Sequence, residues 1–140
     1  MKTWILYALI SMTFAGFTSV IAKIGLKDIS GELGLAVRTS FVFLLIMGFT
    51  AFSVPASQLA ALTAHHFLWL GLSGLTTSLS WIFYYKALKD GEVSIIALID
   101  KGSMVVAILM AFLILKEPIT LRTLLGAFLM IAGLITIIHK

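Results

Sequence analysis

The chain has 140 residues, of which 61% are hydrophobic and only 11% charged, with a formal net charge of +4 and no cysteine. Soluble domains carry about a quarter of their residues as charges, so this composition excludes an ordinary soluble fold. The lack of cysteine excludes disulfides, thiolate metal sites and a cysteine nucleophile, and we predict no metal and no cofactor. The Lys and Arg residues are scattered at helix ends without a clustered basic face, so no nucleic-acid partner is predicted.

Apolar stretches separated by short polar connections fill the sequence. A bilayer core requires about 20 mostly apolar residues for each spanning helix, and five stretches reach about that length. They cover about residues 4–22, 33–54, 67–87, 93–115 and 119–138. The sequence therefore predicts an all-α, polytopic membrane protein with five transmembrane helices in one domain, 1–140.

The first stretch follows Lys2 and could be mistaken for a signal peptide. It is about 19 residues long, which exceeds a usual signal-peptide core, and no convincing small-x-small cleavage site precedes Lys23. We therefore predict a retained first span. Ser11, Ala15 and Ser19 recur four residues apart in it, a stripe that lets helices approach closely in lipid.

The second stretch carries Arg38 about five residues after its start. Two interpretations are open for this arginine: it snorkels or pairs with another helix, or it faces a central cavity. The uncharged connection that follows, 55–66, is predicted to lie in the membrane interface as a half-helix. His65 and His66 fall in this loop, where an interfacial role is favoured over catalysis.

The third stretch is unusually rich in hydroxyl side chains, namely Ser73, Thr76, Thr77, Ser78 and Ser80. Helix packing is the default interpretation of small residues four apart, and a polar, hydrated cavity wall is the alternative, which this crowding favours. Trp81, Tyr84 and Tyr85 end the stretch as interfacial anchors, with substrate stacking as the alternative for Trp81 or Tyr84. Gly91 is predicted to form a left-handed cap after this helix.

The fourth stretch contains two charges, Asp100 and Lys101, within about 6 Å of its midpoint. Each costs about 2.5–3.5 kcal/mol on a lipid-facing surface. The pair Gly102–Ser103 that follows is typical of a helix kink. Either the charges are structural ion-pair partners or they bind substrate or a coupling proton in a cavity.

Neighbouring helical residues point about 100° apart, so direct pairing of Asp100 with Lys101 is disfavoured. Arg38 is the natural partner for Asp100. In the next connection Pro118 is predicted to lie in the first turn of the fifth helix, and Glu117 favours that helix start through the helix dipole.

The distribution of basic residues between the two sides of the membrane is nearly even. Lys2, Lys116 and Arg122 lie on the amino-terminal side, and five lysines lie on the other side, Lys23, Lys27, Lys86, Lys89 and Lys140. This small excess favours an outside amino terminus and leaves room for insertion in both orientations.

Several short motifs occur in a fixed order along the chain. They are Gly16, Lys23 and Arg38 in the first part, then Ala87–Leu88, the Leu115–Glu117 turn, and Gly126, Leu129 and Gly133. This order resembles an EamA domain of the drug/metabolite transporter superfamily. Ala15 stands where many members have Trp, and Asp100–Lys101–Gly102 stands where many have Pro. The latter variant resembles the small five-span bacterial and archaeal branch, which has one unit per chain.

The resemblance implies a transporter. Ten-span relatives contain two inverted units, so a single unit would rebuild that arrangement as an antiparallel homodimer. Helices one to four would surround the path, and helix five would support dimer contact. We expect a secondary transporter or exporter of a small polar or amphipathic metabolite, located in the plasma (cytoplasmic) membrane and working by alternating access.

Arg38, Asp100 and Lys101 are the predicted charged centre, and Ser73, Thr77 and Trp81 the predicted wall of the pathway. The alternative is a non-transporting accessory or scaffold subunit of a larger membrane complex; lipid-carrier translocation is a variant of transport. No serine has a base beside it in sequence, so an enzyme is disfavoured.

Overall fold

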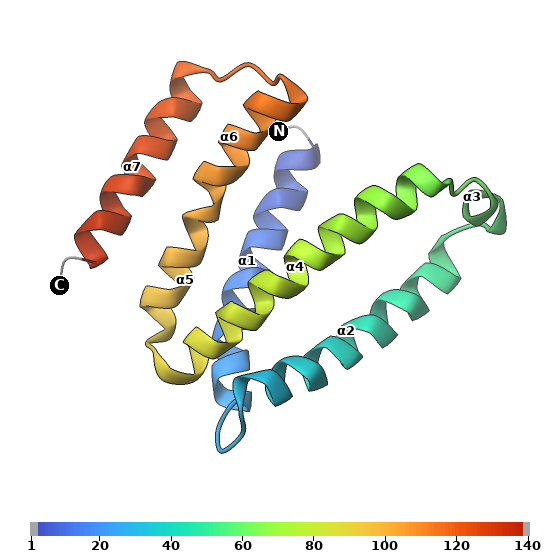
Figure 1. Ribbon diagram of the computed structural model, residues 1–140, viewed down its shortest axis with the longest axis horizontal. Coiled ribbons are helices and arrows are strands. Elements are labelled where there is room, and N and C mark those ends of the chain that lie inside the picture. Colours follow the sequence, from blue (N-terminus) through green and yellow to red (C-terminus); the bar gives the residue numbers. More distant parts are fainter. Residues whose placement is uncertain (1–2, 139–140) are drawn as a thin grey trace. The chain divides into compact units, whose positions relative to one another are not determined.

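The computed structural model describes residues 3–138, and the regular elements of this part of the chain are all α-helices (Figure 1). The helices are α1 (Thr3–Gly25), α2 (Gly31–Ser53), α3 (Ala56–Ala60), α4 (Ala64–Asp90), α5 (Val93–Lys101), α6 (Ser103–Leu115) and α7 (Leu121–Ile138). The all-α prediction is confirmed. Lys2 and Lys140, which entered the charge count, lie outside the described residues.

Among residues 3–138, three helical segments are long and apolar enough to cross a membrane: α1, α2 and the segment Val93–Leu115 formed by α5 and α6. Each has 23 residues, or about 35 Å at 1.5 Å per residue, which exceeds the hydrocarbon core. Helix α4 is longer, with 27 residues, but its hydroxyl, histidine and lysine side chains lower its apolar character. Helix α7 has 18 residues. The chain is thus a helical membrane protein, and the count of five spans stays a prediction.

The chain divides into two compact units, one formed by Val20–Asp90 and the other by residues 1–19 together with 91–140. In the first unit α2 and α4 run antiparallel and are joined through α3 (Figure 1). Leu26, Tyr85 and Leu88 are its buried core, at the end where α2 starts and α4 finishes. Gly31 lies so close to α4 that a Cβ there would be 2.8 Å from the Tyr85 carbonyl oxygen. Only glycine permits this approach.

Helix α4 begins earlier than predicted and includes His65 and His66 in its first turn, so their assignment to the preceding loop is wrong. The physical reason is a cap. The Thr63 N–H donates to Nδ1 of His66 over 3.1 Å, while Phe67 N–H donates to the Thr63 carbonyl over 3.2 Å. His66 therefore acts as the glutamate does in a capping box. The predicted half-helix in the connection is present as α3.

In the second unit the helix Val93–Leu115 is interrupted at Gly102, between α5 and α6, as the Gly102–Ser103 pair predicts. The Gly102 N–H donates to the Ile99 carbonyl over 2.9 Å, a tight i to i−3 bond that breaks the α-helical ladder. A Cβ at Gly102 would lie 3.0 Å from Cδ1 of Leu134, so α7 packs directly against the interruption.

Two predictions about helix ends are wrong. Gly91 is not left-handed; among the described residues positive φ occurs at Asp28 and Lys116, with φ of 62° and 55°. Helix α4 continues to Asp90, and extended Glu92 already precedes α5, so no left-handed step is required between them.

Pro118 lies before α7 rather than in its first turn. The left-handed Lys116 ends α6, and the helix restarts only after Thr120. The Thr120 hydroxyl accepts from the Thr123 N–H over 3.2 Å, and this N-cap sets the start of α7.

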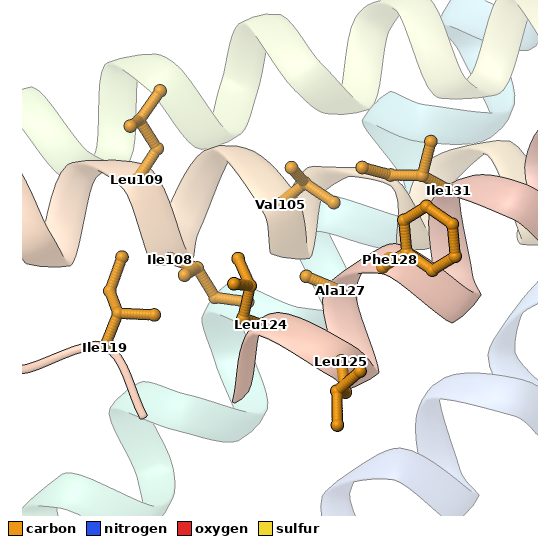
Figure 2. Close-up of a pocket in the computed structure, with 9 residues that line it drawn as sticks. All are labelled: Val105, Ile108, Leu109, Ile119, Leu124, Leu125, Ala127, Phe128 and Ile131. Carbon is orange, nitrogen blue, oxygen red and sulfur yellow. The ribbon is translucent and has the colours of Figure 1, made fainter. Parts of the chain in front are cut away.

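An open groove with a volume of about 530 Å³ lies between helices α6 and α7. Figure 2 shows its lining side chains, all apolar, from both helices and the connection between them. They are Val105, Ile108, Leu109, Ile119, Leu124, Leu125, Ala127, Phe128 and Ile131.

Candidate functional site

The guanidinium group of Arg38 lies against two aromatic rings of α4. Arg38 is the eighth residue of α2, about 10 Å along the helix from its start. Its Cζ lies 4.5 Å from the centroid of the Trp81 ring and 5.9 Å from that of Tyr85. Such cation–π contacts stabilise the charge by about 0.5–2 kcal/mol. Of the predicted site residues, the structure thus brings Arg38 and Trp81 together.

The guanidinium of Arg38 lies between α2 and α4 and does not extend to the end of this pair where α2 begins and α4 finishes. Because Gly31 faces Tyr85 and the helices are antiparallel, Arg38 is level with about Ser78 on α4. Helical side chains lean toward the start of their helix, which carries the guanidinium back to Trp81. The guanidinium contacts the aromatic rings, although the polar end of α2 and α4, which carries Glu32 and Lys86, lies little more than one helical turn further on.

The end of this unit holds a set of polar contacts that involve its helix-borne lysines. Lys86 Nζ lies 3.4 Å from Oε1 of Glu32. Lys23 Nζ donates to the carbonyl oxygens of Leu88 and Lys89 over 2.7 and 2.9 Å, and Lys89 Nζ donates to the Leu26 carbonyl over 3.0 Å. The lysines of α1 and α4 therefore each cap the carboxyl end of the other helix.

A hollow of about 390 Å³ lies beside these contacts, lined by Ser30, Gly31, Glu32, Lys86, Lys89 and Asp90. It contains both charge signs. Within residues 3–138 no group of three or more His, Asp or Glu side chains could hold a metal ion.

The hydroxyl-rich segment of α4 is exposed, and several of its hydroxyl groups donate to carbonyls of the same helix. Thr77 Oγ1 donates to the Ser73 carbonyl over 2.8 Å, and Ser78 Oγ to the Gly74 carbonyl over 2.8 Å. A hydroxyl satisfied in this way tolerates lipid and still offers lone pairs to a hydrated pathway. The predicted roles of Ser73 and Thr77 stay predictions.

The glycines of α4, Gly71 and Gly74, make no close helix contact within the described residues. No atom lies within 4 Å of a Cβ built at Gly74, in contrast to the tight approach at Gly31.

Asp100 and Lys101 form an ion pair, with Nζ of Lys101 3.6 Å from Oδ2 of Asp100. The expectation that these neighbours would not pair is wrong. They are the last two residues of α5, and the long lysine stem folds back where the helix is interrupted. Both side chains are about half exposed. Asp100 and Arg38 belong to different units, and their pairing stays a prediction.

Tyr85 is the site residue that sequence reasoning missed, because it was interpreted as an interfacial anchor. It is only 3% exposed, and its buried hydroxyl has no hydrogen-bond partner among the described residues. The sequence does hold a signal for it. Trp81 and Tyr85 are four residues apart, which places both rings on one face of a helix.

These features define a class of protein: a helical membrane protein with ionisable side chains inside its apolar helices, where such groups mark pathways for solutes or protons. Comparison with known proteins specifies the family. The EamA-like transporter family matches residues 2–139, and the chain belongs to this family. The predicted resemblance to the drug/metabolite transporter superfamily is confirmed.

A protein of a Sinorhizobium species is similar to the chain along almost its whole length. It is described as an "uncharacterized transporter in cobO 3′ region" and is 33% identical over 132 residues, covering 94% of each chain. No solved structure matches the chain.

Proposed function

We propose that the chain is a secondary transporter that moves a small polar or amphipathic metabolite across the plasma membrane by alternating access. Membership of the EamA-like transporter family supports membrane transport. The observation that carries the proposal is the guanidinium of Arg38, 4.5 Å from the Trp81 ring centroid and well inside an apolar helix. A charge in that position is costly on a lipid-facing surface, and charged residues within spans usually line a pathway for solutes or protons.

The charged centre of the proposed transporter consists of Arg38, Asp100 and Lys101. The Asp100–Lys101 pair lies at the interruption between α5 and α6, where the α-helical hydrogen-bond ladder gives way to a tight i to i−3 bond. Ser73, Thr77 and Trp81 form part of the pathway wall in this proposal. A charged or zwitterionic solute suits a centre that carries both signs.

The proposed working unit is a homodimer of antiparallel copies. One EamA unit provides half of an inverted repeat, and a second copy provides the other half. Helix α7 supplies a surface for it, since nothing lies within 4 Å of a Cβ built at Gly126 or Gly133. Small residues of this kind allow close helix approach in lipid.

Reconstitution of the purified chain into liposomes tests the proposal. A pH gradient is imposed, a trapped pH-sensitive dye reports proton movement, and solutes from a defined panel of organic acids, amino acids, amines and sugars are added singly. Solute-dependent proton flux supports a transporter. Absence of flux for every solute, together with a membrane protein that co-purifies stoichiometrically, supports the alternative accessory subunit.

Asp100→Asn tests the coupling role. If Asp100 carries the coupling proton, the variant inserts normally and loses solute-driven proton flux, because an amide does not titrate. Asp90→Asn, at the exposed end of α4, is the matched control and is expected to retain flux. Wild-type flux in Asp100→Asn would exclude this role.

A further inference from the structure

The charge of Arg38 has no counter-ion within the unit Val20–Asp90. Its contacts there are the rings of Trp81 and Tyr85, while the carboxylate of Glu32, on the same helix, is paired with Lys86. Aromatic rings attract a cation but lack the lone pairs that guanidinium N–H groups require. The hydrogen-bond donors of Arg38 therefore have no acceptor in this unit.

The other cations on the helices of this unit are engaged. Lys23 and Lys89 donate to backbone carbonyls at helix ends, and Lys86 pairs with Glu32. In the second unit Lys101 is neutralised by Asp100. In the unit Val20–Asp90, Arg38 is thus the helix-borne cation with neither a carboxylate nor a carbonyl partner. It lies in the segment that the bilayer would surround, where an unneutralised charge is most costly.

We propose that Arg38 binds the carboxylate or phosphate group of the transported solute, so that the substrate is an organic oxyanion. This inference rests on the proposed transport function and names its substrate class. A guanidinium fork donates two parallel hydrogen bonds to a carboxylate or phosphate, which matches the donors left unpaired here. Arg38 and Trp81 are both partly exposed, so a solute reaches them without unfolding the helix pair.

Trp81 is a positioning residue in this site. Its ring centroid lies 4.5 Å from Cζ of Arg38, and this cation–π contact holds the guanidinium against α4 while leaving its N–H groups free for an oxyanion. The same positive charge repels cationic solutes, and this repulsion provides selectivity against them.

Binding is measured through the fluorescence of Trp81. The chain has three tryptophans, and the double variant Trp4→Phe, Trp69→Phe leaves Trp81 as the reporter. Lactate, glycerol 3-phosphate, choline and glycerol are titrated separately into this purified protein in nanodiscs. A saturable change with lactate or glycerol 3-phosphate, and none with choline or glycerol, is the expected result. The two anions also distinguish a carboxylate from a phosphate substrate.

Arg38→Gln in this background removes the charge and is expected to weaken anion binding by about tenfold to a hundredfold. Arg38→Lys keeps the positive charge and is the second variant to measure if Arg38→Gln does not fold. It is expected to bind anions more weakly than wild type, because an ammonium lacks the two parallel donors of the guanidinium. Lys27→Gln, in the exposed turn after α1, is the matched control because it removes one positive charge outside the proposed site, and anion affinity is expected to stay within about threefold.

Three results would overturn the inference. They are saturable binding of choline but of neither anion, unchanged anion affinity in Arg38→Gln, and recovery of a destabilised Arg38→Gln by a second change, Asp100→Asn. The last result would identify Arg38 as a structural partner of Asp100. Anion binding that depends on Arg38, without flux of any solute in liposomes, would uphold this inference and reject the transporter. Flux of amines that is insensitive to Arg38→Gln would reject this inference and uphold the transporter.

Discussion

At the scale of single residues, Tyr85 combines two features that favour different substitutions. Its ring is buried and lies 5.9 Å from Cζ of Arg38, whereas its hydroxyl is buried without a hydrogen-bond partner in the described chain. A buried hydroxyl that forms no hydrogen bond costs about 1–3 kcal/mol of desolvation. The ring therefore contributes to stability and the hydroxyl does not.

Tyr85→Phe is accordingly expected to leave the thermal midpoint unchanged or to raise it, because it removes the unpaired oxygen and keeps the ring. Tyr85→Ala is the contrasting variant and is expected to lose about 3–5 kcal/mol through the cavity it creates. The measurement is thermal unfolding in detergent, followed by intrinsic fluorescence. A drop in midpoint for Tyr85→Phe comparable to that of Tyr85→Ala would show that the hydroxyl has a partner that stabilises the fold.

The sequence predicted part of this site. Arg38 was recognisable because a charge within an apolar stretch is rare, and Trp81 was among the candidates for stacking. Tyr85 was not predicted, since a tyrosine near the end of a span usually lies at the interface. Its burial depends on Gly31, which belongs to another helix, and a single sequence does not reveal which residues of two helices face each other.

At the scale of helices, the packing of α2 against α4 depends on the glycine that starts α2. In Gly31→Ala the new Cβ would lie 2.8 Å from the Tyr85 carbonyl oxygen, and the three atoms nearest to it all belong to the backbone of α4. The helices must separate, at a cost of about 1–3 kcal/mol.

Gly71→Ala is the matched control for this substitution. No atom lies within 4 Å of its Cβ position, and alanine improves helix propensity by about 0.5–1 kcal/mol. We expect the thermal midpoint to be highest for Gly71→Ala, intermediate for wild type and lowest for Gly31→Ala. Equal midpoints for the two variants would contradict the close approach of α2 and α4.

The exchange of lysine caps between α1 and α4 is a second helix-level feature with a measurable contribution. Lys23→Met or Lys89→Met keeps an apolar stem of similar length and removes the ammonium that donates to the other helix. Each is expected to lose about 1–2 kcal/mol, the range for a charged donor at a partly buried helix carboxyl end. Lys27→Met, in the exposed turn after α1, serves as the control in the same unfolding assay. A loss in the control as large as in Lys23→Met would attribute the effect to net charge instead of capping.

The boundaries of the long helices were predictable within about three residues, because apolar runs of bilayer length dominate the sequence. The exact helix ends were harder to predict from the sequence. His66 and Thr120 determine where α4 and α7 begin, and both act through local side-chain hydrogen bonds that a hydropathy pattern does not reveal. Gly91 was assigned to a left-handed cap on residue type alone, whereas the left-handed positions belong to Asp28 and Lys116.

At the scale of the whole molecule, the orientation in the membrane determines whether two copies can form an inverted pair. The charge count of five basic residues against three is a weak bias, and an antiparallel homodimer requires both orientations in one membrane. The absence of cysteine makes this testable with one introduced thiol. Ser57 is suitable because it lies exposed in the short helix α3, in the connection between two long helices.

Ser57→Cys is expected to react partly with a membrane-impermeant thiol reagent added to intact cells, and completely after permeabilisation, because each orientation places α3 on a different side. The unmodified chain, which lacks a thiol, gives the background. A variant with an added arginine in the same connection, Gln58→Arg, tests the charge argument, since it is expected to shift the labelled fraction in favour of the protected side. Labelling of Ser57→Cys that is complete, or absent, before permeabilisation would establish one orientation. An inverted homodimer would then be impossible, and transport would require a parallel assembly or an oppositely oriented partner protein.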